Sequence, residues 1–439
     1  MNTHLREVQR ETIDGDVYQY FESLVDKIIT SGDESDTKFL SFDSSEPPCP
    51  IGPGQFTRLK LTDGSCNLTS FTSSFIKLKI KTTVGFNFSV GMRPIISTLI
   101  DGAMNDCPCL YVGFKSGIHA IDHYRFYCDK GRGYMCEQSQ AVYESAVTYM
   151  VKSQEELEGE QGCYATMENI RKLDPNVPGR YITWKEFKDH FSGSSMDIEF
   201  EVVIKYDDFA PLQFFKSFPN DVCGNIQLEF KIANNKNIVF CQVPFEAQVA
   251  WLKKHRNSTL MQSAIADEKV YMLYGVECND VSFANMGDDC PFRFIDDTTT
   301  ADSGVQAFAG ALYLNEARSY INGYNIKQNK MNEIRDLLST KKIYIPGQRI
   351  DQYSFSQTPT SSNMSCNTTQ SLVNCSSIAF MFPRTSNQLT CSFNPGCNSI
   401  QLQIDNKTYP DKPFSTTSLE HSNYILNNLM FDDLFKPNT

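Results

Sequence analysis

An alternation of apolar and polar residues is the feature that most constrains how this chain folds. Between Ile76 and Lys81 each apolar residue is followed by a lysine. Successive side chains of a β-strand point to opposite faces of a sheet, so this pattern predicts a strand with one buried and one charged face. The same period of two returns at 198–204 and 226–232. The sequence therefore predicts sheets that cover a core on one side.

Further short segments of the same kind recur along the chain. Aromatic residues make up 12% of the sequence, mostly Phe and Tyr, and these residues favour strands. Many short strands joined by turns, with few helices, indicate a β-sandwich or barrel. The candidate strands lie at 58–61, 76–81, 110–114, 124–127, 198–204, 226–232, 239–243, 270–277, 292–295, 342–345, 353–356, 378–382, 389–393 and 400–404.

Helical spacing of apolar residues predicts a few short helices. The first covers 16–30, and Gly32 can end it. The regions 137–173 and 301–332 are interpreted as insertions on a β scaffold, because insertions occur in loops. The other helical segments are predicted at 137–157, 167–173, 211–218 and 332–339.

The length of 439 residues suggests two domains, since one β-sandwich or barrel reaches about 250 residues. A weak internal repeat also favours two domains, because the turns at 218–220 and 393–395 each precede a segment of alternating apolar and polar residues. The predicted organisation is an N-terminal arm with a short helix at 1–54, a first β-domain at 55–243, a connector at 244–269, a second β-domain at 270–415 and a C-terminal tail at 416–439.

Charge and cysteine content exclude several classes of protein. The formal net charge is −12, and phosphate binding requires clustered Lys and Arg, so no sequence-specific nucleic-acid binding is predicted. The 15 cysteines are scattered, residues 1–16 contain no apolar signal core, and no run is long enough to span a bilayer. We interpret the cysteines as reduced thiols of a protein that stays inside the cell and has no transmembrane segment.

Motifs of catalysis and metal binding are missing or incomplete. The sequence has no phosphate loop and no Gly-x-Ser-x-Gly nucleophile turn. His119 and His123 lack the adjacent Glu of a metalloprotease, and Cys107 and Cys109 have no second pair at zinc spacing. We therefore predict no catalytic, cofactor-binding or metal-binding residues. Weaker candidates for zinc or calcium are Cys366, Cys375, Cys391, Cys397, Asp288, Asp289, Asp296 and Asp297.

An ordered set of segments resembles a known family. The second half contains Ile343 to Pro346 and Ile350 to Phe355, then 378–384, 389–395, 400–404 and 406–413; the first half contains 111–115, 121–127, and 209–218 leading to Asn225. In order and spacing these segments resemble the double jelly-roll major capsid proteins of Polinton/Maverick elements, adintoviruses and polinton-like viruses. The resemblance covers most of residues 55–415.

The resemblance implies a structural role in a virion. Its fold would be mainly β, with two consecutive eight-stranded jelly rolls, short helical insertions and terminal arms. Such chains form homotrimeric, pseudo-hexagonal capsomers that tile an icosahedral shell around a double-stranded DNA genome. The implied partners are further copies of the chain, neighbouring capsomers, and penton and minor capsid proteins. The chain would be a non-enzyme located in the virion capsid, assembled in the cytoplasm or nucleus of the host.

The C-terminal tail is too apolar to remain in water and is predicted to dock on a neighbouring subunit or on its own. Two other functions stay open. The Ser/Thr/Asn-rich loop at 356–370 could serve a glycan- or receptor-binding protein, and a pair of carboxylates could serve a β-sandwich glycoside hydrolase, although no pair stands out. The predicted docking residues are Leu419, Ile425, Leu426, Leu429, Met430, Phe431, Leu434 and Phe435.

Overall fold

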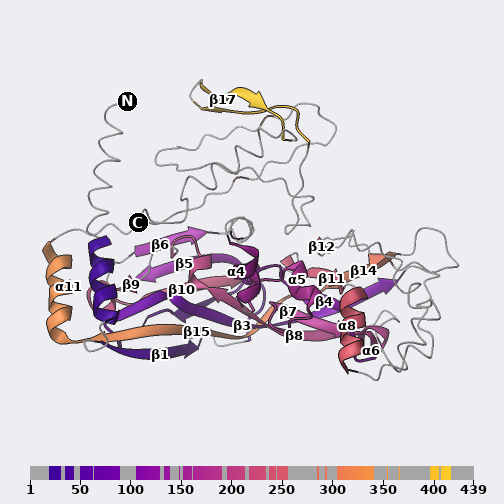
Figure 1. Cartoon of the computed structure of the whole chain (residues 1–439), viewed down its shortest axis with the longest axis horizontal. Coiled ribbons are helices and arrows are strands. Elements are labelled where there is room, and N and C mark those ends of the chain that lie inside the picture. Colours follow the sequence, from indigo (N-terminus) through magenta and orange to yellow (C-terminus); the bar gives the residue numbers. More distant parts are fainter. Residues whose placement is uncertain are drawn as a thin grey trace.

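Within the part of the chain that the structure describes, strands predominate and the helices are short (Figure 1). The predicted mainly β class is therefore confirmed. This structure is a computed structural model. It describes residues 19–30, 35–43, 50–62, 64–88, 105–128, 133–138, 148, 152–160, 162–189, 195–212, 217–233, 237–243, 245–255, 284–285, 292–293, 304–340, 353, 365, 396–404 and 407–416.

The elements follow the predicted alternation closely in the first half. The strands are β1 (Ser35–Asp43), β2 (Phe56–Lys60), β3 (Leu68–Phe88), β4 (Pro108–Gly113), β5 (Ile121–Cys128), β6 (Gly133–Gln138), β7 (Gly179–Thr183), β8 (Ser195–Lys205), β9 (Ser217–Phe218), β10 (Ile226–Ile232), β11 (Val239–Gln242), β12 (Ala284–Asn285), β13 (Phe292–Arg293), β14 (Gly304–Ala309), β15 (Tyr313–Ile326), β16 (Ile400–Ile404) and β17 (Lys407–Phe414). The helices are residues 19–30, η1 (Gly117–Ala120), α4 (Gln154–Gly159), α5 (Met167–Arg171), α6 (Trp184–Asp189), η2 (Tyr206–Asp208), α7 (Asn220–Cys223), α8 (Phe245–His255) and α11 (Gln328–Thr340).

A seven-stranded antiparallel sheet is built around β3. Its order is β1-β15-β3-β14-β13, and β8 and β9 also pair with β3. The 21 residues of β3 are long enough to pair with β8 and β15 near the middle and with β9 and β14 at the two ends. In β8 the burial alternates strictly, so its apolar side chains point into the core and its charged ones point out.

Two four-stranded sheets cover the apolar face of this large sheet. Their orders are β2-β10-β5-β6 and β12-β11-β4-β7, and every pairing in them is antiparallel. Buried side chains of all three sheets form one continuous core, as when Phe114 meets Phe200 edge to face at 5.7 Å between ring centroids. The three sheets, whose strands lie between residues 35 and 326, thus form a β-sandwich with a filled interior.

The sheet crosses the predicted domain boundaries. Strand β1 comes from the predicted arm, yet all nine of its residues pair with β15. Strands β14 and β15 come from the predicted second domain, yet both pair with β3 of the first. The interpretation of 301–332 as an insertion was therefore wrong, because residues 304–326 form strands of the central sheet. The division into two domains stays a prediction.

Several helix predictions can be compared with the structure. Residues 19–30, α5 and α11 confirm the helices predicted at 16–30, 167–173 and 332–339. The helix predicted over 137–157 was wrong at its start, where β6 continues to Gln138, and right at its end, where α4 begins. The helix predicted at 211–218 was wrong at Ser217 and Phe218, because these residues pair with β3.

The N-terminal helix packs on its own chain. Phe21, Val25 and Ile28 are buried against Met331 and Ile334 of α11. Figure 1 shows this helix standing beside α11 at one end of the sandwich. A salt bridge from Arg335 of α11 to Asp221 of α7 joins the same end to the sheet, and Arg335 Nε lies 2.7 Å from the carboxylate.

Candidate functional site

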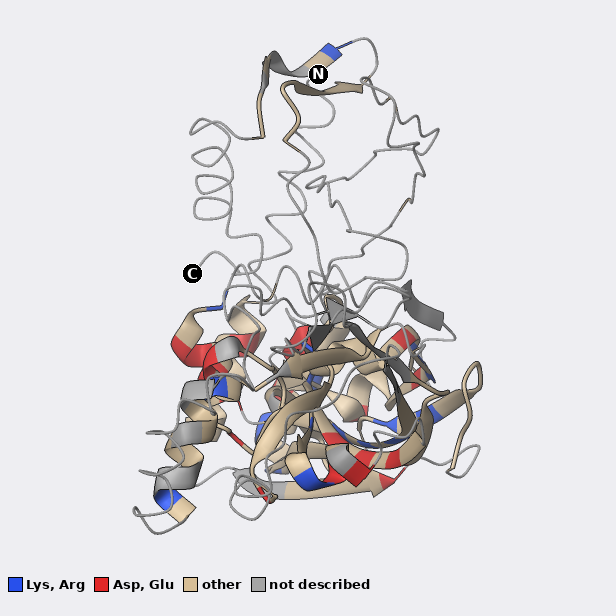
Figure 2. Cartoon of the chain, turned by 90° about the vertical axis from the view of Figure 1, so that its right-hand side faces the viewer, with Lys and Arg blue, Asp and Glu red and all other residues tan. Residues whose placement is uncertain are grey.

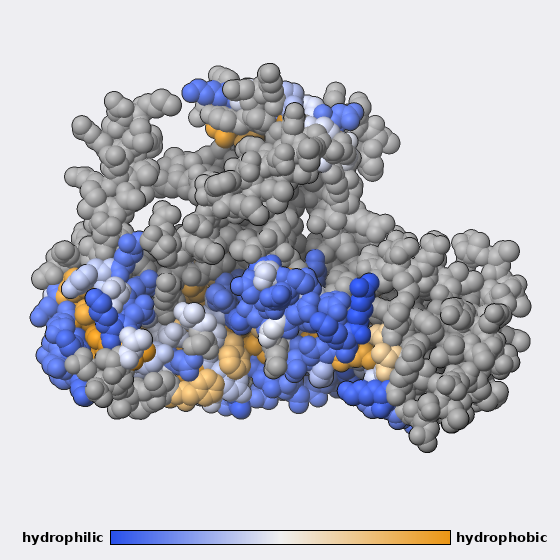
Figure 3. Space-filling view, viewed as in Figure 1, coloured by the Kyte–Doolittle hydropathy of each residue, from blue (hydrophilic) through white to orange (hydrophobic). Residues whose placement is uncertain are grey.

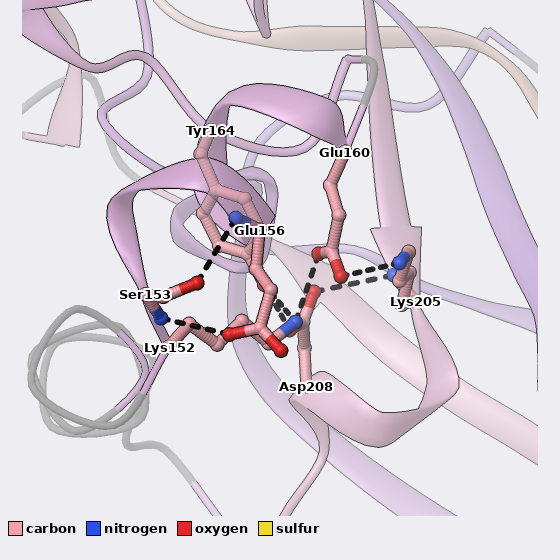
Figure 4. A network of polar contacts seen from close by, with 7 residues as sticks. All are labelled: Lys152, Ser153, Glu156, Glu160, Tyr164, Lys205 and Asp208. Carbon is pink, nitrogen blue, oxygen red and sulfur yellow. Dashed lines mark hydrogen bonds and ion pairs between the residues drawn. The ribbon is translucent and has the colours of Figure 1, made fainter.

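A buried cluster of charged groups joins the region around α4 to the large sheet (Figure 4). Lys152 Nζ donates to Glu160 at 2.8 Å and to the Tyr164 hydroxyl at 3.0 Å, and it lies 3.6 Å from Asp208 Oδ1. The Tyr164 hydroxyl donates to the Asp208 carboxylate, and Lys205 pairs with Glu160. We call Lys152, Glu160, Tyr164, Lys205 and Asp208 the buried network.

Local sequence explains why these groups meet. A capping box starts α4, since Ser153 accepts from the Glu156 N–H and Glu156 accepts from the Ser153 N–H. After α4, Gly162 adopts a positive φ of 76° close to Val203, which brings Tyr164 back toward β8. On the other side, η2 follows β8 directly and carries Asp208. The region 152–164 is thus attached to the sheet by ionic contacts.

Burial changes the proton affinities of this network. It raises the pKa of Asp208 to about 6, despite the opposing effect of Lys152, and it also raises the pKa of Asp207. Burial alone would lower the pKa of Lys152, but the nearby carboxylates outweigh it and raise that pKa. Burial and the Asp208 charge raise the pKa of Tyr164, which keeps this hydroxyl protonated. The groups bind one another, so the network is suited to holding structure together.

Cross-strand ion pairs line the outer face of the large sheet. Lys77, Lys79 and Lys81 of β3 pair with three acidic residues of β8 at 2.7, 3.2 and 2.9 Å. Figure 2 shows blue basic and red acidic segments close together in the lower part of the described chain. We call this row the charge ladder. Its acidic members are Asp197, Glu199 and Glu201. Three cations facing three anions leave the ladder neutral.

A different arrangement covers the outer face of β2, β10 and β5. Glu229 lies between Arg58 and Arg125 in the strand register and accepts from both, at 3.1 and 3.4 Å. Tyr127 adds a third donor at 2.9 Å. The Arg125 guanidinium lies 5.0 Å from the centroid of the Phe56 ring, and the Arg58 guanidinium lies 5.8 Å from that of Tyr127. Basic and aromatic side chains therefore alternate on this face.

The residues considered as metal ligands are not brought together. His119 is buried in η1, where burial lowers its pKa to about 3, while His123 lies on the outer face of β5 against Phe56. Burial raises the pKa of the Cys107 thiol to about 12 and also raises the pKa of Cys109. Neither thiol takes part in a disulfide, and the reduced state of the cysteines stays a prediction. Among the described residues, no cluster of three potential metal ligands occurs.

Other predicted residues fall outside the described part of the chain. These include the eight docking residues of the tail, the loop at 356–370 apart from Ser365, the cysteines 366, 375 and 391, and the acidic pairs at 288–289 and 296–297. Cys397 is described and is a free, half-buried thiol. The buried network was not predicted. Its sequence signal was the Ser-x-x-Glu capping box at 153–156, which marks the start of α4.

The surface seen in Figure 3 is mainly hydrophilic over the described residues, with apolar atoms in small separate patches. In the described segments, no helix is long and apolar enough to cross a bilayer. Among the residues that the structure describes, the most exposed large apolar side chains are those of Tyr20 and Phe39, at 61% and 60%. Phe39 lies on edge strand β1 and stacks on Tyr320, which stacks in turn on Phe75.

Solved structures that match this chain include two viral major capsid proteins and a chain of a virophage. The mavirus major capsid protein matches with a TM-score of 0.32 and 10% identity over 66% of this chain and 47% of its own. A chain of the Sputnik virophage matches with 0.32 and 9% over 67% and 48%, and the Faustovirus major capsid protein with 0.30 and 7% over 68% and 56%. This chain spans about half the length of these three structures.

These TM-scores are low, so the proposals below rest on this chain's own residues. No family model matches the sequence. No curated protein matches it either.

Proposed function

We propose that this chain is a viral major capsid protein and that three copies form a pseudo-hexagonal capsomer of an icosahedral shell around DNA. The observation that carries the proposal is the ordered set of capsid-like segments in the sequence. Two of its three first-half members lie on strands of a filled β-sandwich, since 111–113 lie in β4 and 121–127 in β5. A sandwich hides most strand edges, so copies associate through defined surfaces rather than by open-ended strand pairing.

The chemistry of the described residues supports a structural role. The charged clusters found here are ion pairs that connect strands or attach α4 to the sheet. A catalytic group needs an open side facing substrate, whereas Lys152 and Asp208 face each other and are 19% and 2% exposed. The proposed protein is therefore a non-enzyme that needs no cofactor.

The two-jelly-roll organisation, the Polinton/Maverick relationship and the partners belong to the same proposal. Each capsomer would contact its neighbours and separate penton and minor capsid proteins. The net charge of −12 gives no reason to expect direct genome binding, so another layer would contact the DNA. The chain would assemble inside the host cell.

Negative-stain electron microscopy of the purified chain tests the capsomer. Three chains of 49.8 kDa each should give uniform six-sided particles of about 149 kDa by light scattering. Particles that remain monomers or two-fold dimers at all concentrations would overturn the capsomer proposal, and glycan-binding and hydrolase assays would follow.

The tail at 416–439 is proposed to dock between subunits through its apolar residues. Leu429→Ser combined with Phe431→Ser should reduce association, because burial of a Leu or Phe side chain contributes about 1.5–3 kcal/mol. Asn428→Ser is the matched control, since it changes a polar residue of the same segment. Particles of unchanged mass and stability in the double variant would contradict a docking role for the tail.

A further inference from the structure

The outer face of β2, β10 and β5 has a surplus of positive charge in an acidic chain. Its strand register aligns three rows of three side chains. We call these nine residues the basic face: Phe56, Arg58, Lys60, Gln227, Glu229, Lys231, His123, Arg125 and Tyr127. Four of them are Lys or Arg and one is acidic, and Asp122 beside the face pairs with Lys231 at 3.4 Å. Strand β6 continues the sheet, and its register places Glu137 opposite Arg125. Four cations against these three carboxylates leave one positive charge, and Lys60 is the exposed cation of the four for which no carboxylate lies opposite in the register.

The basic face differs from the charge ladder in how its cations are paired with carboxylates. In the ladder each lysine has its own carboxylate. On the basic face the two arginines share the Glu229 carboxylate, whose side chain is 11% exposed, whereas Arg58 is 48% exposed. Lys60 is exposed at the end of β2. The face therefore offers cations and half-buried aromatic rings together.

Residues 417–439 have the complementary composition. This segment contains Glu420, Asp432 and Asp433 against Lys436, together with the apolar docking residues. Two of its acids stand next to Phe431 and Leu434, so one short stretch presents both carboxylates and apolar side chains. When extended, a chain of this length reaches about 75 Å, at about 3.3 Å per residue, which allows docking on its own or a neighbouring copy.

We propose that the basic face binds the acidic, apolar C-terminal tail, with Asp432 and Asp433 near Lys60 and the arginines, and Phe431 or Leu434 against Phe56 or Tyr127. This inference rests on the docking role proposed above for the tail and names the surface that receives it. Carboxylates gain charge-assisted hydrogen bonds from the arginines, and the apolar side chains cover the rings.

Zero-length cross-linking of the full chain tests proximity. A carbodiimide joins a carboxylate to an amine only when the two touch, so the tail acids should link to Lys60 or Lys231. Asp432→Asn with Asp433→Asn should abolish these links. Tail links to lysines 77, 79 or 81 instead, or no link to the basic face, would overturn the proposal. Mixing isotope-labelled and unlabelled chains assigns each link to one chain or to two.

A charge swap tests the energetics in the full chain. Lys60→Glu should speed amide hydrogen exchange of residues 417–439 about fivefold, because an attraction of about 1 kcal/mol is lost. Adding Asp432→Lys and Asp433→Lys should restore the protection. Lys79→Glu on the charge ladder is the matched control and should leave tail exchange unchanged.

The two proposals can fail separately. If the protein forms six-sided particles but amide exchange of the tail is unchanged by Lys60→Glu and by the charge swap, this inference is wrong and the capsomer proposal stands. A chain that never forms such particles, but whose tail responds to the swap, would retain the inference and overturn the capsomer.

Discussion

Lys152→Met is the perturbation that most directly tests the buried network. It removes the cation between Glu160 and Asp208 while keeping a long apolar side chain. The side chain of Lys152 is 19% exposed and that of Asp208 is 2% exposed. Little water can therefore reach the Asp208 carboxylate to replace the lost ion-pair partner. Removing one member of a buried ion pair costs about 3–5 kcal/mol. Because Lys205 still pairs with Glu160, we expect the lower end, about 3 kcal/mol.

The loss of stability caused by Lys152→Met should depend on pH in a defined direction. Burial raises the pKa of Asp208 to about 6, above its usual value of 3.8. The folded state therefore binds this proton more tightly, so stability from the protonated form is present at low pH and is lost as pH rises through about 6. Without Lys152 the pKa of Asp208 rises further. The penalty of the variant should thus be largest near pH 8 and shrink below pH 6.

Thermal unfolding followed by the fluorescence of buried Trp184 measures this effect. At pH 8 a loss of about 3 kcal/mol should lower the Tm by about 3 °C, because the entropy of unfolding of a chain this long is about 0.9 kcal/mol per kelvin. Lys79→Met is the control, because that lysine is 41% exposed and its ion pair lies in solvent, where such pairs contribute little. A Lys152→Met penalty no larger than the control's, or one that grows as pH falls, would refute the assignment of Lys152 as the cation of a buried network.

Three further predictions follow from other contacts. Gly117→Ala places a Cβ 2.1 Å from the Val203 carbonyl oxygen, so it should lower the free energy of unfolding in urea by about 2–3 kcal/mol. Gly64→Ala is the control, because its Cβ meets nothing within 4 Å and should leave this free energy unchanged. Equal urea midpoints for the two variants would contradict the packing around Gly117. The free energy of unfolding should fall between pH 6.5 and 4, because a pKa of about 3 for His119 makes the folded state resist a proton that the unfolded state binds. His119→Leu should make this fall less steep. An unchanged dependence of the unfolding free energy on pH would argue against burial of the ring. Arg335→Ala should lower the free energy of unfolding by less than about 1 kcal/mol, because the ion pair of Arg335 with Asp221 is half-exposed. It should also speed amide hydrogen exchange in α11, since this pair holds the helix. Unchanged exchange in α11 would show that the pair does not hold it.

The elements predicted best were those with a clear local period. Residues 76–81, 198–204 and 226–232 alternate in sequence and form β3, β8 and β10. Their inner faces are apolar and buried, so local pattern and tertiary environment agree. Residues 19–30 likewise place Phe21, Val25 and Ile28 on one helical face, and this face packs on the chain's own α11.

The elements missed were those whose state depends on distant partners. Residues 35–43 are largely polar and resemble a linker, yet β1 forms because β15 offers a free edge nearly 300 residues later, as Phe39 pairs with Asn322. Strand β15 itself was assigned to an insertion, since nothing local indicates that it lies beside β3. Pairing over such separations is set by the whole sheet and leaves little trace in a short window.

Charge in this chain serves different purposes according to its exposure. The buried network cannot exchange partners without leaving a carboxylate in a dry site, so it fixes the position of α4. The ladder is exposed but neutral, and the charged residues on an outer face discourage association with other sheets. The basic face combines exposure with unbalanced charge and aromatic area. A segment rich in acids and apolar residues can lower its free energy by binding there, and the tail is such a segment in this same chain.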